Sequence, residues 1–308
     1  MNDTRRAVLD ALAEGPVSGP ELADRLGVSR AAVWKHVDAL RDAGFDVEST
    51  DAGYVVAEVP DYGAAAVEFG LDAPYRVEHH DSVASTNDRA RDLAADGASD
   101  VVVVADEQTG GRGRLKRAWS SPSGGVWASL VLRPDRPPAH VPVFTLAAAV
   151  AVARACREAG APAVIKWPND VLVDGSERKL AGVLTEMEGE ADRVSWLVVG
   201  AGVNANVDAD ALPPGATSVR EEAGDVDRRR FLQRTLETFH ELWEDPDRIL
   251  PAWRELSVTL DRRVRVETAT EVLEGEAVDV TFPGALVVRT ADGRRTIHAG
   301  ECEHLRPA

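Results

Sequence analysis

Cysteine, lysine and long apolar runs are all scarce in this chain of 308 residues. Its two cysteines, Cys156 and Cys302, lie far apart and match neither a Cys-x-x-Cys metal motif nor a disulfide framework. We therefore expect no zinc or redox site, and a reducing cytoplasm as the setting. The apolar stretch 141–155 contains Pro142 and Arg154, and the N-terminus has no apolar signal segment, so we expect neither a membrane span nor export.

Lysine supplies only four of the 35 basic residues, while aspartate and glutamate total 52, which gives a formal net charge of −17. An acidic excess of this size usually argues against a nucleic-acid partner. An acidic surface with little lysine is also favoured at molar salt, where charges are strongly screened, so we expect a halophilic protein. Each remaining lysine becomes a candidate for a role that arginine cannot fill, because the two cations differ in shape and hydration.

The chain divides into three blocks, over residues 1–60, 61–256 and 257–308. In the first block, three short amphipathic patterns predict helices, and Ser18 and Ser29 are suitable N-caps for the second and third. Two strand-like segments around an Asp-Ala-Gly turn follow them. We therefore predict a winged helix-turn-helix domain over residues 1–60.

The second and third blocks differ in pattern. The second alternates strands and helices, which predicts an α+β domain with a mixed sheet; strands are expected at 101–105, 126–132, 164–167, 171–173, 180–185 and 195–203, and helices at 87–95, 142–159 and 227–243. The third contains only short strands, which predicts a small β barrel, with strands at 264–267, 276–280, 286–290 and 295–298. The length of the chain allows two or three domains and is ample for a core.

The third predicted helix carries the candidate DNA-binding residues Ser29, Arg30, Trp34 and Lys35 near its N-terminal end. A recognition helix presents this end to the major groove. The surrounding block is acidic, however, with six basic and eleven acidic residues between 1 and 60. DNA readers normally carry a basic patch. A module for dimerisation, or a vestigial one with Trp34 packed between helices, therefore remains an alternative.

A glycine- and arginine-rich segment follows the predicted strand 101–105. We name residues 108–119 the Gly/Arg loop; it begins Gln108-Thr-Gly-Gly-Arg112-Gly113-Arg114. Its glycines let backbone amides approach an anion, and its arginines suit phosphate or carboxylate. The loop lacks the Gly-Lys-Ser/Thr of a Walker A motif and the third glycine of a dinucleotide fingerprint. The loop predicts an anionic ligand of another kind.

A second group of polar residues surrounds the end of another predicted strand. Lys166-Trp-Pro-Asn169-Asp170 ends this strand, and Lys179 begins the next one. Proline stops a strand, which leaves Asn169 and Asp170 at its mouth, where their oxygens suit Mg²⁺ or a nucleotide site. Two of the four lysines fall in this short segment, and Lys116 lies in the Gly/Arg loop. This clustering favours an anion-binding site.

Five motifs in order resemble the bifunctional biotin protein ligase/biotin operon repressor family. They are Ser85-Thr86-Asn87, the Gly/Arg loop ending in Trp119, Lys166-Trp-Pro-Asn-Asp, Arg178-Lys-Leu-Ala-Gly182 and Gly200-Ala-Gly202-Val-Asn204-Ala-Asn. The resemblance spans nearly the whole chain and implies a winged helix, a class II synthetase-like domain and an SH3-like C-terminal barrel. It also implies a two-step reaction, in which biotin and MgATP form biotinyl-5′-adenylate and a lysine of a biotin carboxyl carrier protein then takes the biotinyl group.

The same resemblance implies roles for individual residues. The catalytic set is Lys179, Arg114 and Arg112. The biotin set is Ser85, Thr86, Asn87, Gln108, Arg112, Gly113, Trp127, Lys179, Gly182, Gly200 and Gly202. The ATP set is Arg114, Trp119, Lys166, Asn169, Asp170 and Asn204, with Asp170 as the Mg²⁺ ligand. A homodimer that binds operator DNA is also implied.

One position departs from the family pattern, and two other functions remain open. The family often reads Gly-Arg-Gly-Arg-x-Gly-Arg, whereas Lys116 replaces the last glycine here, so closure of the loop is expected to differ. The first alternative is a lipoate-type ligase on the same fold. The second is a DNA-binding regulator whose ligase domain serves only as a biotin sensor.

Overall fold

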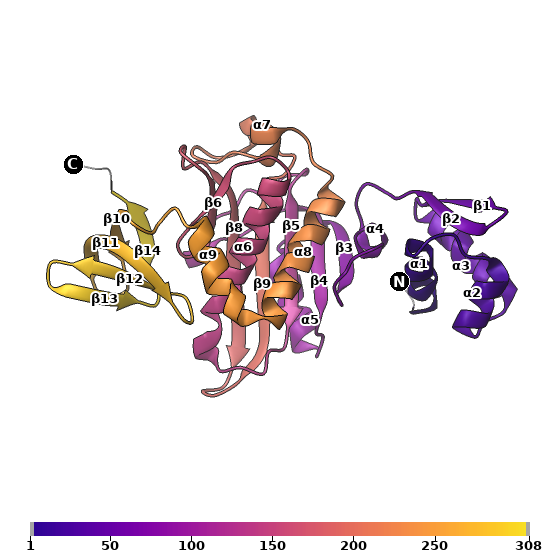
Figure 1. Ribbon diagram of the computed structural model, residues 1–308, viewed down its shortest axis with the longest axis horizontal. Helices are drawn as coiled ribbons and strands as arrows, with labels where there is room; N and C mark the ends of the chain where they lie inside the picture. Colours follow the sequence, from indigo (N-terminus) through magenta and orange to yellow (C-terminus); the bar gives the residue numbers. More distant parts are fainter. Residues whose placement is uncertain (1–2, 306–308) are drawn as a thin grey trace. The chain divides into compact units, whose positions relative to one another are not determined.

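The computed structural model describes residues 3–305 and divides between Val77 and Glu78 into two compact units. The first unit holds the N-terminal helices and a two-stranded sheet, and the second holds the two larger sheets. Figure 1 shows the elements of each unit in chain order. The two units are described separately below.

The first unit is a winged helix-turn-helix, as the sequence predicts. It contains α1 (Asp3–Ala13), α2 (Gly19–Leu26), α3 (Arg30–Asp42), β1 (Asp46–Thr50), β2 (Gly53–Glu58) and α4 (Ala64–Glu68). Both expected caps are confirmed, because Ser18 Oγ accepts from the amide of Glu21 and Ser29 Oγ from that of Ala32, each at 3.2 Å. Fully buried apolar side chains from the three helices form its core.

The second unit is built on a seven-stranded sheet of order β3-β4-β5-β9-β8-β7-β6. Its strands are β3 (Arg76–Val83), β4 (Val101–Gln108), β5 (Val126–Leu132), β6 (Ala163–Lys166), β7 (Asp170–Val173), β8 (Lys179–Gly189) and β9 (Val194–Val203). Six of these strands are predicted by the sequence. The seventh, β3, escapes prediction because it is a polar edge strand, Arg-Val-Glu-His-His-Asp-Ser-Val, without apolar alternation.

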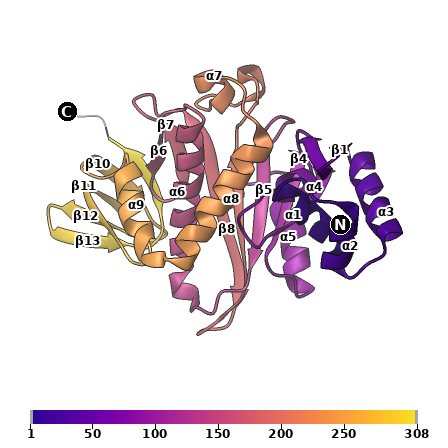
Figure 2. The same ribbon diagram turned by 45° about the vertical axis from the view of Figure 1, so that its right-hand side comes forward.

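Helices cover both faces of this sheet (Figures 1 and 2). Val103 of β4 packs with α5 (Thr86–Ala95), whereas its neighbour Val102 faces α8 (Arg228–Glu244), because successive strand residues point to opposite faces. Also present are α6 (Pro142–Glu158), α7 (Val219–Ala223) and α9 (Ile249–Leu256). Helix 138–158 is long and apolar enough to cross a membrane, but 67% of its 18-residue window is buried. A mostly buried helix in the core of a protein can have the same length and apolar composition.

The C-terminal residues form a five-stranded antiparallel sheet of order β13-β12-β11-β10-β14, which corresponds to the predicted SH3-like domain. Its strands are β10 (Arg263–Glu267), β11 (Val272–Thr281), β12 (Ala285–Thr290), β13 (Gly293–Ile297) and β14 (Glu301–His304). Trp167 fixes this sheet to the larger one, because its indole Nε1 donates to Gly284 O and its backbone amide to Thr259 Oγ1, each at 2.9 Å. Glu301, Cys302 and Glu303 of the last strand line the cavity described below.

Candidate active site

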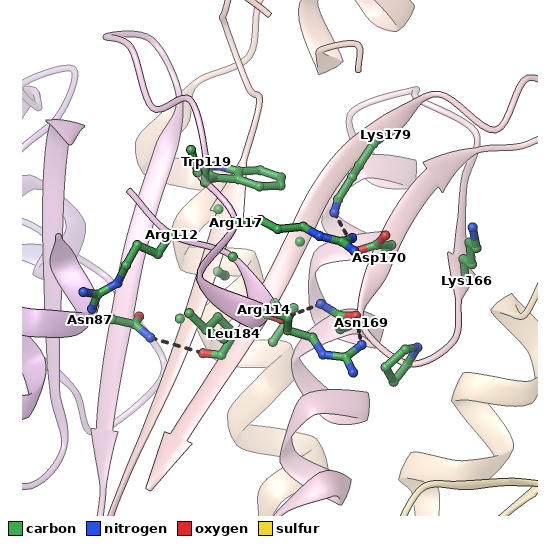
Figure 3. Close-up of a pocket in the computed structure, with 18 of the residues that line it drawn as sticks. Asn87, Arg112, Arg114, Arg117, Trp119, Lys166, Asn169, Asp170, Lys179 and Leu184 are labelled. Atoms are coloured by element: carbon green, nitrogen blue, oxygen red, sulfur yellow. Dashed lines mark hydrogen bonds and ion pairs between the residues drawn. The ribbon is translucent and has the colours of Figure 1, made fainter. Parts of the chain in front are cut away.

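A cavity of about 420 Å³ opens where β8, β9, the Gly/Arg loop and β14 meet (Figure 3). The predicted site residues come to it from separate parts of the sequence. Those that line the cavity are Ser85, Thr86, Asn87, Gln108, Arg112, Gly113, Arg114, Trp119, Lys166, Asn169, Asp170, Lys179, Gly182, Gly200 and Gly202. Five sequence motifs thus converge on one site.

Two residues expected in the site, Trp127 and Asn204, lie outside the lining of this cavity. Trp127 is fully buried, and its Nε1 donates to Pro122 O at 3.0 Å. The Asn204 amide donates to Thr217 O at 2.9 Å and to Lys179 O at 3.4 Å. Asn204 therefore supports the backbone of Lys179, and its own side chain does not border the cavity.

One end of the cavity is a cluster of neutral side chains, which we name the polar cluster: Thr86, Asn87, Gln108, Ser121 and Ser129. Gln108 Oε1 accepts from the Thr86 amide at 2.8 Å, while its Nε2 donates to Ser121 Oγ at 2.9 Å. Ser129 is fully buried and lies within hydrogen-bond distance of both Thr86 and Asn87. Buried polar groups that are mutually satisfied hold one another in a single arrangement.

The other end, which we name the cationic end, carries charged groups. Lys179 Nζ lies 2.7 Å from Asp170 Oδ1 and 4.9 Å from the centre of the Trp119 ring. The Asn169 Nδ2 donates to Val183 O at 2.8 Å, and its Oδ1 accepts from Arg114 at 3.2 Å (Figure 3). Carboxylate and amide oxygens are suitable ligands for Mg²⁺, so the chemistry of Asp170 and Asn169 fits the expected ion.

Three arginines of the Gly/Arg loop line the cavity, and each has a partner. Arg112 pairs with Asp88, and Arg117 donates to Glu301 Oε2 at 2.6 Å. Arg114 donates to Asn169 Oδ1 at 3.2 Å and to Gly300 O at 2.9 Å, and burial lowers the pKa of its guanidinium. An anionic ligand would have to exchange with these internal partners.

The expected departure of the loop at Lys116 has a structural counterpart. Leu115 and Lys116 both adopt left-handed backbone angles, with φ of +54° and +59°. Glycine adopts this conformation freely, whereas other residues pay a steric cost. Leu115 is also 71% exposed, which is unusual for a leucine. The tip of the loop thus carries strain at the position where the family pattern has glycine.

Several lining or supporting residues were not predicted from the sequence. Ser129 belongs to the polar cluster, and Glu186 lies behind it. Arg117 extends the arginine pattern of the Gly/Arg loop, and this pattern was the sequence signal for it. Glu301, Cys302 and Glu303 reach the cavity from β14, and no local motif marks them. Burial raises the pKa of the Cys302 thiol to about 11.

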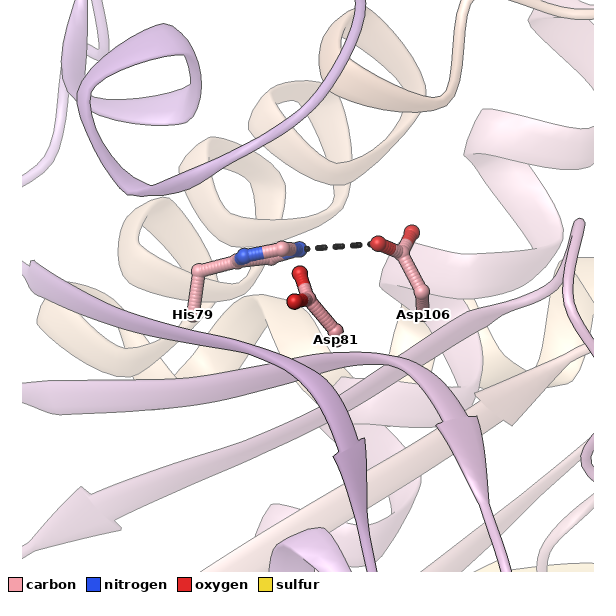
Figure 4. Close-up of side chains that lie close together, drawn as sticks. All are labelled: His79, Asp81 and Asp106. Atoms are coloured by element: carbon pink, nitrogen blue, oxygen red, sulfur yellow. Dashed lines mark ion pairs between the residues drawn. The ribbon is translucent and has the colours of Figure 1, made fainter. Parts of the chain in front are cut away.

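A separate group of possible metal ligands lies outside the cavity, on β3 and β4 (Figure 4). It contains His79, Asp81 and Asp106, whose ligand atoms lie within 4.8 Å of one another. Asp106 has two close partners, His79 Nε2 at 3.3 Å and Arg228 Nη1 at 3.0 Å. These contacts occupy Asp106, and we assign no metal to the group.

The candidate DNA-binding residues lie on one exposed side of α3. Arg30, Trp34 and Lys35 are exposed, and the Trp34 side of the helix is turned away from the core formed by Val33, Val37 and Leu40. Trp34 is 54% exposed, so the alternative in which it packs between helices is wrong. Ser29 is the N-cap of this helix.

Three family models match consecutive parts of the chain. They describe a helix-turn-helix domain over residues 4–55, a biotin/lipoate A/B protein ligase family over residues 80–204, and a biotin protein ligase C-terminal domain over residues 259–305. Their order matches the architecture of the two units.

A curated relative from Bacillus subtilis, named bifunctional ligase/repressor BirA, is 37% identical over 93% of both chains. The chain belongs to the bifunctional ligase/repressor family. Within this family, the protein named BirA in Escherichia coli is 31% identical over 88% of this chain and 87% of its own length. A ligase without an assigned repressor name, from Paracoccus denitrificans, is 36% identical over 70% of this chain and 95% of its own.

Solved structures agree with this membership of the ligase/repressor family. The biotin protein ligase of Aquifex aeolicus, solved in complex with biotin and ATP, is 28% identical with a TM-score of 0.63 and covers 75% of this chain and 99% of its own. The fold of the second unit is therefore that of a biotin protein ligase.

Proposed function

We propose that this protein attaches biotin to a lysine of a biotin carboxyl carrier protein in an ATP-dependent reaction through biotinyl-5′-adenylate. One observation carries the proposal: a single cavity joins a neutral polar cluster to a cationic end with Lys166, Lys179, Arg114 and Arg117. The neutral end suits the ureido ring of biotin, and the cationic end suits the triphosphate. The names and ligands of the relatives support the same assignment.

Lys179 is the residue we assign to the first chemical step. A carboxylate is a weak nucleophile that a triphosphate repels, so an enzyme must hold both reactants together and stabilise the charge that develops at the α-phosphate. Lys179 Nζ pairs with Asp170 Oδ1 at 2.7 Å. Exchange of that partner for the biotin carboxylate and the α-phosphate brings the ammonium between the two reacting groups.

Asp170 and Asn169 would hold Mg²⁺ through a carboxylate and an amide oxygen, once Lys179 and Arg114 turn toward substrate. The ion would neutralise part of the triphosphate charge. Trp119 lies against Gly182 and Gly202, where an added Cβ would come within 3.3 Å and 2.8 Å of its ring. This flat aromatic surface suits adenine stacking.

Arg112 and Arg114 are the residues we assign to retention of the adenylate. Both belong to the Gly/Arg loop, and Arg114 joins Asn169 to Gly300 across the cavity. A closed loop would exclude water from the mixed anhydride until a carrier lysine attacks it. Hydrolysis of the intermediate is the side reaction that this closure prevents.

Transfer of radiolabelled biotin to a purified carrier domain tests the proposed activity directly. The full chain is incubated with ATP, Mg²⁺ and the carrier, at low salt and at molar salt, with lipoic acid as the comparison substrate. We expect labelling of the carrier with biotin only. Labelling with lipoic acid and not with biotin would support the lipoate-type alternative. Absence of both would reject the ligase assignment.

We also propose that the winged helix represses biotin genes by binding a symmetric operator as a homodimer. The support is the exposed side of α3, where Arg30, Trp34 and Lys35 lie together. The acidic balance of residues 1–60 weakens phosphate attraction. Affinity must therefore rest on base contacts and apolar burial, which predicts a weak dependence on salt.

An anisotropy titration with operator-sized DNA tests this second role. It is run in potassium chloride from about 0.2 M to about 2 M, a range over which screening lengths fall toward about 3 Å. Biotin and ATP are added or omitted, since a ligand that favours the dimer should tighten binding. Absence of ligand-enhanced, sequence-selective binding across the range would leave α3 with a dimerisation role. A cytoplasmic location and a preference for high salt complete the proposal.

A further inference from the structure

Glu186 of β8 lies behind the polar cluster and is not part of the cavity lining. One of its carboxylate oxygens, Oε2, accepts from Asn87 Nδ2 at 2.7 Å, and the other, Oε1, accepts from Arg91 Nη1 at 3.4 Å. Its side chain is 27% exposed. Neither the predicted site nor the roles assigned above include this carboxylate.

The Asn87 amide has one allowed orientation because of Glu186. Its Nδ2 donates to Glu186 Oε2 and to Leu184 O, the latter at 3.4 Å (Figure 3), so both N–H groups are used. An amide turned by half a rotation would place Oδ1 against a carboxylate and a carbonyl, which also only accept. Asn87 Oδ1 therefore faces Ser129 and Gly200; an added Cβ at Gly200 would lie 2.0 Å from it.

The number of available protons also fixes the direction of the hydrogen bonds at Thr86. Ser129 Oγ lies 2.6 Å from Asn87 Oδ1 and 2.8 Å from Thr86 Oγ1, but a hydroxyl has only one proton. Because Asn87 Oδ1 only accepts, the Ser129 proton goes to it. The proton of Thr86 is then directed to Ser129 or to Gln108 Oε1, which lies 3.1 Å away. Thr86 Oγ1 and Asn87 Oδ1 are left as acceptors.

We propose that Glu186 sets the hydrogen-bond polarity of the polar cluster, and so selects a ligand ring that presents N–H donors. This inference rests on the proposed function, since the ureido ring of biotin carries two N–H groups. A dithiolane ring, as in lipoic acid, carries none, so the remaining lone pairs of Thr86 Oγ1 and Asn87 Oδ1 would lose contact with water and gain no hydrogen bond. An unpaired buried polar group costs more than a missing contact, so this polarity discriminates between the two acids.

Glu186 acts here as a positioning residue. Its ion pair with Arg91 is a simpler explanation for any effect of substituting Glu186, so the tests must distinguish the two roles. Arg91 has a second carboxylate partner in Asp88, which also holds Arg112 of the Gly/Arg loop. Loss of Glu186 therefore leaves Arg91 paired. An effect confined to biotin affinity would come through Asn87, whereas an effect through Arg91 would not depend on the residue at position 87.

The first test is Glu186→Gln in the full-length protein, measured by biotin-dependent ATP–pyrophosphate exchange. The glutamine has the same size but can face Asn87 with either its oxygen or its nitrogen, so the amide loses its fixed direction. We expect the KM for biotin to rise about tenfold, with kcat and the KM for ATP within about twofold of wild type. Glu188→Gln is the matched control, since Glu188 lies two residues along the same strand and is exposed.

In the second test, the carboxylate and the amide exchange places between positions 87 and 186. Asn87→Asp alone places two carboxylates together and should raise the biotin KM by at least about thirtyfold. In the double variant Asn87→Asp/Glu186→Gln, the glutamine Nε2 donates to the aspartate, whose other oxygen still accepts from Ser129. We expect the double variant to regain at least about tenfold in biotin KM over Asn87→Asp.

The outcomes separate this inference from the function on which it rests. A wild-type protein with no biotin-dependent exchange overturns the proposed function, and this inference with it. An active wild type with an unchanged biotin KM in Glu186→Gln, or with losses that simply multiply in the double variant, overturns the polarity role alone. Circular dichroism of each variant checks the fold, and recovery in the double variant cannot arise from misfolding.

Discussion

The two ends of the cavity are built on different physical principles. At the polar cluster, side chains such as Ser129 are fully buried and bound to one another by neutral hydrogen bonds. At the cationic end, Lys179 and Arg117 are partly exposed and held by Asp170 and Glu301. The first arrangement needs little change to accept a neutral ring, whereas the second must release its internal carboxylates before an anion can bind.

This difference indicates how one enzyme can bind two substrates by different means in a single cavity. A preformed pocket loses little conformational freedom when its ligand enters, so binding there is efficient. The charged side chains of the cationic end stay solvated and paired with internal partners until an anion that binds them more tightly replaces those partners. No buried charge is therefore left unpaired. Disturbance of the polar end should therefore affect capture of biotin, and disturbance of the cationic end should affect chemistry and retention of the adenylate.

The largest effect is expected for Lys179→Ala at the cationic end. This variant removes the ammonium that we assign to the space between the biotin carboxylate and the α-phosphate. Biotin-dependent ATP–pyrophosphate exchange should fall by about 100- to 1000-fold. Exchange at the wild-type rate in this variant would remove Lys179 from the reaction.

Two glycine substitutions compare the ends directly. An added Cβ at Gly200 would lie 2.0 Å from Asn87 Oδ1, whose amide is fixed, whereas one at Gly182 would meet Trp119 and Lys179 at 3.3 Å and 3.4 Å. The latter neighbours are side chains that can shift. We expect Gly200→Ala to lower kcat/KM for biotin about 10- to 100-fold and Gly182→Ala by less than about fivefold. Equal losses in the two variants would contradict the difference in rigidity.

Arg114→Gly should weaken the contacts of the Gly/Arg loop at the cationic end and leave biotin binding nearly unchanged. Arg114 bridges Asn169 and Gly300 O, so its loss removes one of the two contacts, with Arg117 to Glu301, that hold the loop to the start of the last strand. Leakage of adenylate should rise about tenfold, seen as label on bystander lysines, with a small change in biotin KM. Arg117→Gly is the comparison, because Arg117 is 67% exposed and should contribute less. Equal leakage from wild type and Arg114→Gly would reject the closing role.

The smallest effect concerns the tip of the Gly/Arg loop. Lys116→Gly removes the steric cost of a left-handed residue but adds freedom to the unfolded chain. We expect a net gain of about 0.5 kcal/mol in the free energy of unfolding, or about 1 °C in Tm, by calorimetry. Lys116→Ala keeps the strain and should show no gain. A destabilised Lys116→Gly would mean that the lysine side chain makes a contact that offsets the strain.

Sequence reasoning identified most of the cavity because its motifs are local in the chain. The Gly/Arg loop and Lys179 each stand in a short segment with recognisable chemistry, whereas Ser85 to Asn87 were predicted from the resemblance to the ligase/repressor family. The winged helix was equally accessible, because caps such as Ser18 and Ser29 act over three residues. Local rules thus predicted most of the helices and strands and most of the residues that line the cavity.

The remainder depends on pairing between distant segments. Glu186 touches Asn87 across 99 positions of sequence, and Glu301 touches Arg117 across 184. Nothing near Glu186 marks it as different from its exposed neighbour Glu188. Asn204 looked like a ligand residue in its motif, yet its amide turns to the backbone of Lys179. Only the register of the strands decides which of these side chains reaches the cavity.

Cys302 has a consequence for the fate of an activated acyl group. It lines the cavity, where a biotinyl-adenylate would be a reactive mixed anhydride. A thiolate there would capture the acyl group as a thioester and inactivate the enzyme by its own product, since the thiolate is the reactive form. With a pKa of about 11, only about one thiol in ten thousand is ionised at neutral pH. Burial of this sulfur thus makes the cavity resistant to self-acylation.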